Sequence, residues 1–400
     1  MNHAIIEDTA KDIEDTAEKN ISAYIHIPFC EHICYYCDFN KVFLEGQPVD
    51  EYIEALLKEM AQTLKKHPID ASETIYVGGG TPTSLTAQQL DRLLTGIHQI
   101  LPTSTTKEFT VEANPGDLSE DKMVVLKSHG INRLSMGVQT FDDRLLKKIG
   151  RKHTAADVYQ TINMLEKHDF QNVTIDLIYA LPGQTMESFR DTLTRAIDLG
   201  LPHYAMYSLI LENKTMFMNW VRQGRMALPS QEAETQMFDE AIEAMARAGL
   251  NQYEISNFAR PGYESKHNMV YWNNAHYFGF GAGASGYLGQ TRYKNKGPIQ
   301  HYLEPLRHDT LPIHEREVLT KANQMEEELF LGLRKKCGIS KTHFQQKFDT
   351  SYQDVYGKVT QELVQKGWLA EELDRIYLTK AGMFIGNDVF EAFLIDSEAK

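Results

Sequence analysis

The sequence predicts an α/β fold in which a partial (β/α)6, TIM-like barrel precedes a smaller helical, winged-helix-like domain. Three observations lead to this prediction. Short β-rich runs alternate with helical stretches over residues 21–310, unusual polar residues recur where those runs end, and the pattern changes from residue 311 to residue 400. A chain of 400 residues is long enough to bury the core of one large barrel and a small second domain.

Six β-rich runs define the predicted barrel. They are residues 23–27, 74–77, 108–112, 132–135, 172–178 and 203–210. Between them the apolar residues repeat with helical spacing; over residues 50–66 they form one stripe behind a predicted N-cap at Asp50. Six strand–helix units in succession indicate a parallel sheet, and right-handed crossovers curl such a sheet toward a barrel.

Composition and charge exclude several classes of function. The formal net charge of −14 argues against nucleic acid as the main partner, because phosphate binding requires clustered Lys and Arg. No apolar run approaches the roughly 20 residues that span a bilayer. Residues 1–20 hold six acids and two lysines, unlike a signal peptide, and we expect them to be an acidic, flexible N-terminus. These features predict a cytoplasmic protein.

Three of the four cysteines, Cys30, Cys34 and Cys37, fall within eight residues. Because the cytosol keeps thiols reduced, this clustering predicts metal ligation rather than disulfides. Three thiolates on one loop suit a [4Fe–4S] cluster whose fourth iron keeps an open coordination position. A zinc knuckle completed by His26 or His32 is the alternative.

Polar or glycine-rich motifs follow the later strands as well. Because the carboxyl ends of parallel strands converge on one mouth, we expect these motifs to form one site. The triple glycine of GGGTPT lets backbone carbonyls approach an ammonium group, although a tight turn is the alternative. Arg151 is always cationic and suits a carboxylate, with a surface salt bridge as its alternative. The motif residues are Gly79, Gly80, Thr81, Glu112, Gln139 and Asp176.

The segment YIHIPFCEHICYYC, from Tyr24 to Cys37, resembles the radical S-adenosylmethionine (SAM) signature of the oxygen-independent coproporphyrinogen III oxidase family. The resemblance continues through GGGTPT, VEANPG, MGVQTF, IGRKHT and DLIYALPGQT and covers nearly the whole chain. It implies a radical SAM barrel in which the open iron chelates SAM and one electron yields a 5′-deoxyadenosyl radical. The implied SAM contacts are Tyr24, Gly79, Gly80, Thr81, Glu112, Gln139, Arg151 and Asp176.

Two features favour the haem-chaperone branch of this family. The oxidases carry a further cysteine two positions after the third cluster ligand, where this sequence has Phe39. The segment HNMVYW, residues 267–272, resembles a haem-chaperone motif, as does the C-terminal pattern that begins at Leu378. Imidazole is a common axial ligand of haem iron, and aromatic rings cover a porphyrin face. The candidate haem residues are therefore His267, Tyr271 and Trp272, with a packed polar–aromatic patch as the alternative.

The last third of the chain carries three further predictions. The stretch FGFGAGASGYLG, residues 278–289, fits GxGxxG but lacks a flanking βαβ unit, and we interpret it as a flexible wall beside the SAM adenine. Helices near 321–336, 340–347 and 353–366, followed by a small hairpin, predict the winged-helix-like domain. Cys337 is expected to be a buried thiol of that domain's core.

The resemblance implies a haem chaperone that binds haem, a [4Fe–4S] cluster and SAM and delivers haem to acceptor haemoproteins, membrane-associated respiratory enzymes among them. The alternative is an oxygen-independent coproporphyrinogen III oxidase, which decarboxylates propionates by hydrogen abstraction. The sequence leaves open whether the protein is an enzyme. It indicates SAM-cleaving potential but argues against coproporphyrinogen oxidase activity.

Overall fold

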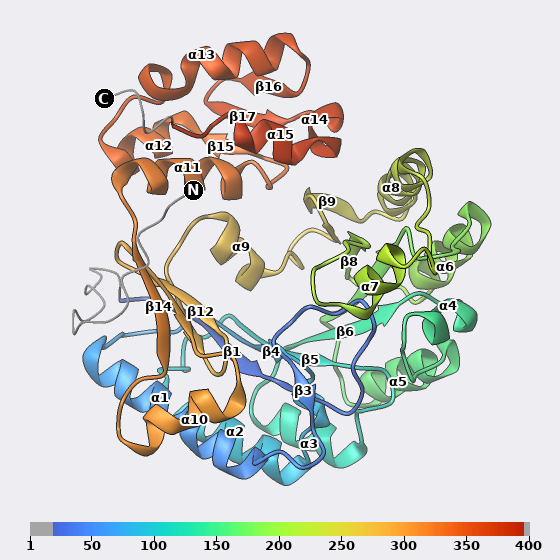
Figure 1. Cartoon of the computed structure of the whole chain (residues 1–400), viewed down its shortest axis with the longest axis vertical. Helices are drawn as coiled ribbons and strands as arrows, with labels where there is room; N and C mark the ends of the chain where they lie inside the picture. The colour runs from blue at the N-terminus through green and yellow to red at the C-terminus, as the bar shows by residue number, and fades with distance from the viewer. Residues whose placement is uncertain (1–18, 396–400) are drawn as a thin grey trace.

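The computed structural model describes residues 19–395 and consists of an open α/β barrel with a smaller helical domain above it (Figure 1). Its main sheet has twelve strands in the order β14-β13-β12-β11-β1-β4-β5-β6-β7-β8-β10-β9. The six predicted strands run parallel at its centre. They are β1 (Ser22–Ile27), β4 (Thr74–Gly79), β5 (Glu108–Ala113), β6 (Arg133–Gln139), β7 (Val173–Tyr179) and β8 (His203–Ser208). The predicted partial (β/α)6 barrel is confirmed; most of the predicted acidic N-terminus lies outside the described residues.

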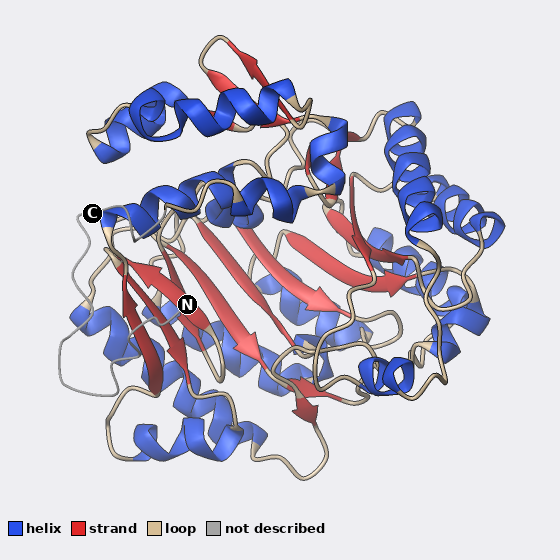
Figure 2. Cartoon of the chain, turned by 45° about the horizontal axis from the view of Figure 1, so that its top comes forward, coloured by secondary structure: helices blue, strands red, loops and turns tan. Residues whose placement is uncertain are grey.

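Helices connect these strands and cover one face of the sheet (Figure 2). They are α1 (Val49–Lys66), η1 (Pro82–Ser84), α2 (Ala87–Ile100), α3 (Glu120–Ser128), α4 (Asp143–Lys148), α5 (Ala155–Lys167), α6 (Met186–Asp198), α7 (Met216–Arg222) and α8 (Gln231–Arg247). The N-cap predicted at Asp50 is wrong, because α1 starts at Val49 behind Pro48. Asp50 lies in the first turn, where its charge still favours the helix dipole. Within residues 19–395, no helix is both long and apolar enough to cross a bilayer.

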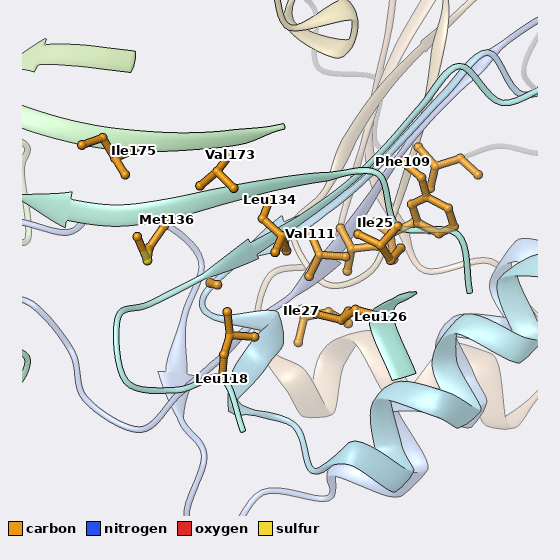
Figure 3. Close-up of a cluster of buried hydrophobic side chains, with 14 of the residues drawn as sticks. Ile25, Ile27, Phe109, Val111, Leu118, Leu126, Leu134, Met136, Val173 and Ile175 are labelled. Atoms are coloured by element: carbon orange, nitrogen blue, oxygen red, sulfur yellow. The ribbon is translucent and has the colours of Figure 1, made fainter. Parts of the chain in front are cut away.

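The two faces of the sheet differ because side chains alternate along each strand. Ile25, Val111, Leu134 and Ile175 are at most 1% exposed and point into the apolar core beneath the helices (Figure 3). The residues next to them in sequence point to the opposite face, into the lumen of the open barrel. Those lumen positions carry polar and aromatic side chains: Tyr24, Tyr76, Glu112, Ser135 and Asp176.

Four further strands extend the sheet beyond β1; the first pairs parallel with β1, and the others pair antiparallel with one another. β11 (Tyr277–Phe280) pairs parallel with β1 and continues through β12 (Ser285–Leu288), β13 (Thr291–Asn295), α10 (Ile299–Arg307) and β14 (Ile313–Val318). The glycine-rich stretch therefore forms two strands and the turn between them. Gly281 in that turn has φ +99°, and a Cβ there would lie 2.6 Å from the His26 carbonyl oxygen. β14 also carries the main sheet beyond residue 310, where the sequence predicted the first domain to end.

The remaining strands lie at the other edge and beside the cysteine loop. β9 (Asn251–Glu254) and β10 (Asn257–Ala259) form an antiparallel pair next to β8. β2 (Phe29–Cys30) and β3 (Val42–Phe43) pair parallel to each other.

The C-terminal domain has its own apolar core, which includes Leu329, Phe344 and Ile376. Its elements are α11 (Lys321–Gly332), β15 (Ile339–Ser340), α12 (Lys341–Phe348), α13 (Tyr352–Gln365), β16 (Leu369–Glu372), β17 (Arg375–Leu378), α14 (Lys380–Phe384) and α15 (Gly386–Glu391). This arrangement is the predicted helical, winged-helix-like fold. The prediction for Cys337 is wrong: α11 ends at Gly332, and Cys337 is exposed in the following turn.

Helix α9 (Lys266–Trp272) lies between the barrel sheet and the C-terminal domain (Figure 1). Glu108, the first residue of β5, accepts hydrogen bonds from the backbone amides of Lys266 (3.0 Å) and His267 (2.9 Å). Arg133 Nη1 lies 3.8 Å from Glu108 Oε2, and both side chains are 2% exposed. This buried carboxylate therefore caps the helix and compensates the guanidinium charge.

We expect Glu108→Ala to lower the free energy of unfolding by about 3–5 kcal/mol, because it leaves the buried Arg133 without its counter-charge. Urea unfolding followed by circular dichroism measures the loss. Glu73→Ala is the control, since Glu73 forms an exposed pair with Lys107 and its removal should cost less than about 1 kcal/mol. Equal losses in the two variants would contradict the structural role given to Glu108.

Candidate functional site

The cysteine loop is held at the carboxyl end of the barrel by backbone hydrogen bonds. The Cys37 amide donates to the Cys34 carbonyl (3.3 Å), and the Leu44 amide donates to the Cys30 carbonyl (2.9 Å). Cys30 is buried, with its Sγ 3.6 Å from the Thr81 hydroxyl, and burial raises the pKa of its thiol to about 11. Cys34 and Cys37 are half-buried. The three thiols thus lie on one closed loop beside the glycine motif.

The donor set fits an iron–sulfur cluster better than a single ion. Within the described part of the chain, no three His, Cys, Asp or Glu side chains are grouped around one metal-ion position. In a [4Fe–4S] cluster each thiolate binds a different iron, so three separated thiols are what it needs. His26 does not supply a ligand for the alternative zinc knuckle, because its ring nitrogens lie 2.9 Å from the Tyr24 hydroxyl and 2.7 Å from the Asn40 carbonyl.

A cavity of about 260 Å³ lies beside this loop. Three of the predicted SAM residues, Tyr24, Gly79 and Glu112, line it. Phe39 lines it too and is 63% exposed. The rest of its wall consists of His26, Asn40, Gly283, Ala284 and Ser285. The turn between β11 and β12 therefore forms one wall of the cavity, and the two strands of the sheet hold it in place.

The glycines of GGGTPT let β4 approach the cysteine loop and Glu112. Gly79 has φ +121°, and a Cβ there would lie 2.5 Å from the His26 ring; a Cβ on Gly80 would lie 2.7 Å from the Pro28 carbonyl carbon. The Gly79 amide donates to Glu112 Oε2 (2.9 Å). The pKa of Glu112 is raised by burial, which the hydrogen bonds from Tyr76 and Gly79 oppose. The GGGTPT segment therefore makes a tight turn, and its residue Gly79 also lines the cavity.

Arg151 connects the cysteine loop to the ends of β5 and β6. Its guanidinium lies 3.5 Å from Cys34 Sγ, 2.8 Å from Asn114 Oδ1 and close to the Gly137 carbonyl. Its Nε is buried and has no hydrogen-bond partner among the described residues. A buried donor without an acceptor carries a desolvation cost.

Gln139 and Asp176 complete the group at the strand ends. Gln139 has φ +70° at a register shift between β6 and β7, a conformation that non-glycine residues rarely adopt. A Cβ on Gly137 would lie 2.8 Å from both Gln139 Nε2 and Arg151 Nη2, so any larger residue there would displace the ends of these side chains. Asp176 accepts from the Ser135 hydroxyl (3.3 Å), and burial, helped by the charge of Glu112, raises its pKa to about 7.

The candidate haem residues lie on α9, at the opposite end of the lumen. His267 is 1% exposed, and its ring nitrogens lie 2.7 Å from the Thr74 hydroxyl and 2.8 Å from the Tyr271 hydroxyl. Burial lowers its pKa to about 3. Trp272 is half-buried, with the Arg334 guanidinium 4.6 Å from its ring centroid. In this conformation His267 has no free nitrogen for iron, and the segment is a packed polar–aromatic patch.

Sequence reasoning missed three residues that build the site. Tyr76 donates to Glu112, Asn114 binds both Arg151 and the Thr81 hydroxyl, and Asn40 donates to the carbonyls of Ala282 and Gly297. For Tyr76 a signal exists, because alternation along 74–77 places it on the same face as Gly78. The two asparagines lie in loops, where no periodicity reveals the direction of a side chain.

Comparisons with known proteins agree with this geometry. The radical SAM superfamily matches residues 24–196, and the HemN C-terminal domain matches residues 319–385. Heme chaperone HemW of Lactococcus lactis subsp. lactis (strain IL1403) is 51% identical over 382 residues, 95% of this chain and 98% of that protein. Heme chaperone HemW of Bacillus subtilis (strain 168) is 49% identical over 93% of this chain and 99% of that protein.

Among solved structures, coproporphyrinogen III oxidase (HemN) from Escherichia coli, a radical SAM enzyme, matches with a TM-score of 0.83. The match covers 94% of this chain and 90% of that one at 24% identity, and it supports the fold alone. The sequence relatives, by contrast, share about half of their residues with this chain over nearly its whole length. The chain belongs to the HemW haem-chaperone family within the radical SAM superfamily.

Proposed function

We propose that the protein binds a [4Fe–4S] cluster on Cys30, Cys34 and Cys37, binds SAM beside it, and carries haem to acceptor haemoproteins. The single observation that supports the cofactor site best is the Arg151 guanidinium 3.5 Å from Cys34 Sγ, a cation held beside the loop that carries the three thiols. The chaperone role is supported by two relatives, both heme chaperones HemW, that are 49–51% identical to this chain. Membrane-associated respiratory enzymes are the acceptors that we propose to test first.

Each residue of the site has a proposed part in holding SAM. When bound, the cluster supplies an open iron and an electron for SAM chemistry. Arg151 binds the SAM carboxylate through its guanidinium, and Glu112 accepts from the ribose hydroxyls. The backbone of Gly79 and Gly80 meets the methionine ammonium. Tyr24, Thr81, Gln139 and Asp176 complete the SAM contacts.

For haem we propose the α9 element His267, Tyr271 and Trp272, with His267 in a positioning role. The buried imidazole hydrogen-bonds the Tyr271 hydroxyl, so it can orient that group. Tyrosine is a known haem ligand in proteins, and Tyr271 is half-buried whereas His267 is 1% exposed. The hydrogen-bond pattern therefore favours Tyr271 over His267 as the residue to test first for ligation.

A second candidate function is oxygen-independent coproporphyrinogen III oxidase, whose family signature the segment from Tyr24 to Cys37 resembles. The exposed Phe39 at the cavity argues against it, because the oxidases resembled by this sequence carry a cysteine at that position. SAM cleavage as such remains compatible with both functions.

Cluster loading should depend on the loop thiols. Anaerobically reconstituted protein is expected to carry about four irons and four sulfides per chain, and Cys34→Ala should lose most of this iron. Cys337→Ala, which removes an exposed thiol outside the site, is the matched control and should load normally. Iron and sulfide assays with the absorption spectrum measure the result. Stoichiometric zinc without sulfide would contradict the cluster.

SAM affinity should depend on the Arg151 guanidinium. Arg151→Ala removes a charge-assisted contact of roughly 1.5–3 kcal/mol, so the Kd for SAM should rise about tenfold or more. Equilibrium dialysis of the reconstituted protein measures this Kd, and iron content checks the cluster. Arg144→Ala is the control, because that side chain is 88% exposed. Wild-type affinity in Arg151→Ala would place the SAM carboxylate elsewhere.

Haem binding separates the two functions. The reconstituted protein should bind haem in a near one-to-one ratio with a shifted Soret band, and with SAM, reductant and coproporphyrinogen III it should form no protoporphyrinogen. Tyr271→Phe should alter the Soret spectrum, since it removes the proposed ligand atom. His267→Ala should chiefly lower thermal stability, because it breaks two buried hydrogen bonds.

Robust conversion of coproporphyrinogen III without specific haem binding would overturn the chaperone proposal. A spectrum that changes in His267→Ala but not in Tyr271→Phe, with unfolding temperatures matched, would instead return the ligand role to His267.

A further inference from the structure

We propose that Tyr76 is a positioning residue for SAM: it holds the Glu112 carboxylate in the orientation that the ribose requires, and helix α9 holds Tyr76. This inference rests on the proposed SAM site and assigns a residue to it. Tyr76 does not itself line the cavity, whereas Glu112 does. Tyr76 therefore acts through Glu112.

The hydrogen bonds at Glu112 define this role. The Tyr76 hydroxyl donates to Oε1 at 2.7 Å, and the Gly79 amide donates to Oε2 at 2.9 Å. One donor thus fixes each carboxylate oxygen from the protein side. An ionised carboxylate has about four acceptor positions, so further ones stay open for ligand hydroxyls. If either donor were removed, the Glu112 carboxylate would be free to rotate away from its present orientation.

The Tyr76 ring is held between two other rings. The Tyr24 ring lies 6.1 Å from it at an interplanar angle of 29°, and the His267 ring lies 5.1 Å from it at 30°. Ring pairs at these separations attract each other and restrict rotation. His267 is in turn fixed by the hydroxyls of Thr74 and Tyr271. The orientation of the phenol is therefore set by β1 and α9 together.

The space around Gly78 shows how closely the Tyr76 and Glu112 side chains pack. A Cβ on Gly78 would lie 2.7 Å from Tyr76 Cε1 and 2.8 Å from Glu112 Cδ. Contacts this short require one of the two side chains to move, so the first glycine of GGGTPT preserves the hydrogen bond between them. The geometry connects the end of the lumen that holds α9 to the end that holds the cavity. SAM binding then depends on a residue that SAM does not touch.

A double-mutant cycle tests the proposal. The Kd for SAM is measured by equilibrium dialysis on anaerobically reconstituted wild type, Tyr76→Phe, Glu112→Ala and the double variant, with iron content and thermal unfolding in parallel. Phenylalanine keeps the ring stack and removes only the hydroxyl. We expect Tyr76→Phe to weaken SAM binding about tenfold in the wild-type background but less than about twofold beside Glu112→Ala, because no carboxylate remains to be positioned.

Two further variants keep the test decisive. Gly78→Ala should weaken SAM binding as Tyr76→Phe does, since its Cβ would displace the same pair. Tyr204→Phe is the control: its hydroxyl is buried but donates to the Ala196 carbonyl (2.8 Å), so its removal should lower stability and leave SAM affinity unchanged.

Three results would overturn the inference while leaving the SAM site standing. They are an unchanged Kd in Tyr76→Phe, the same loss in both Glu112 backgrounds, and an equal loss in Tyr204→Phe. A wild-type protein that binds its cluster but no SAM would instead overturn the proposed SAM site, and this inference with it.

Discussion

The two-residue alternation of side chains along the parallel strands is the constraint on which the rest of this structure depends. On one face it places Ile25, Val111 and Leu134 in an apolar core that the helices close off from water. On the other face it places tyrosines, carboxylates and hydroxyls in a lumen. A shift of one residue in any strand would exchange the two sets, so the burial of the apolar set also fixes where the polar set points.

The polar groups that line the lumen need hydrogen-bond partners. Helix α9 supplies such partners at the amino-terminal ends of the strands. Glu108 caps the helix and compensates Arg133, while His267 pairs with Thr74. The same helix meets the C-terminal domain on its other side, where the Lys335 ammonium donates to Asn273 (2.8 Å) and Arg334 covers Trp272. Residues 267–272, which resemble a haem-chaperone motif, therefore lie in a helix that contacts both domains.

At the carboxyl-terminal ends, too, several polar groups are buried without full compensation. Arg151 Nε has no partner among the described residues, and burial keeps the pKa of Asp176 well above its ordinary value. Gln139 adopts an unfavourable backbone conformation. Such costs concentrate at sites that bind ligands, where a ligand supplies the missing partners. The carboxyl-terminal end of the lumen thus carries the three thiols, the Arg151 guanidinium and two buried carboxylates, and the amino-terminal end is closed by α9.

The sequence by itself determined the order of the six central strands, the cysteine loop and the motifs at the strand ends. These features depend on the period of apolar residues and on the spacing of motif residues, and both can be seen in short stretches of the chain. It failed at Asp50, because α1 begins one residue earlier, and at Cys337, which lies exposed beyond the end of α11. It also did not show that residues 278–289 contain two strands of the main sheet. Only the tertiary structure decided that His267 is enclosed by Thr74 and Tyr271 and that Tyr76 reaches Glu112. Thr74 and His267 are 193 positions apart and Tyr76 and Glu112 are 36 apart, and local patterns do not report which distant side chains meet.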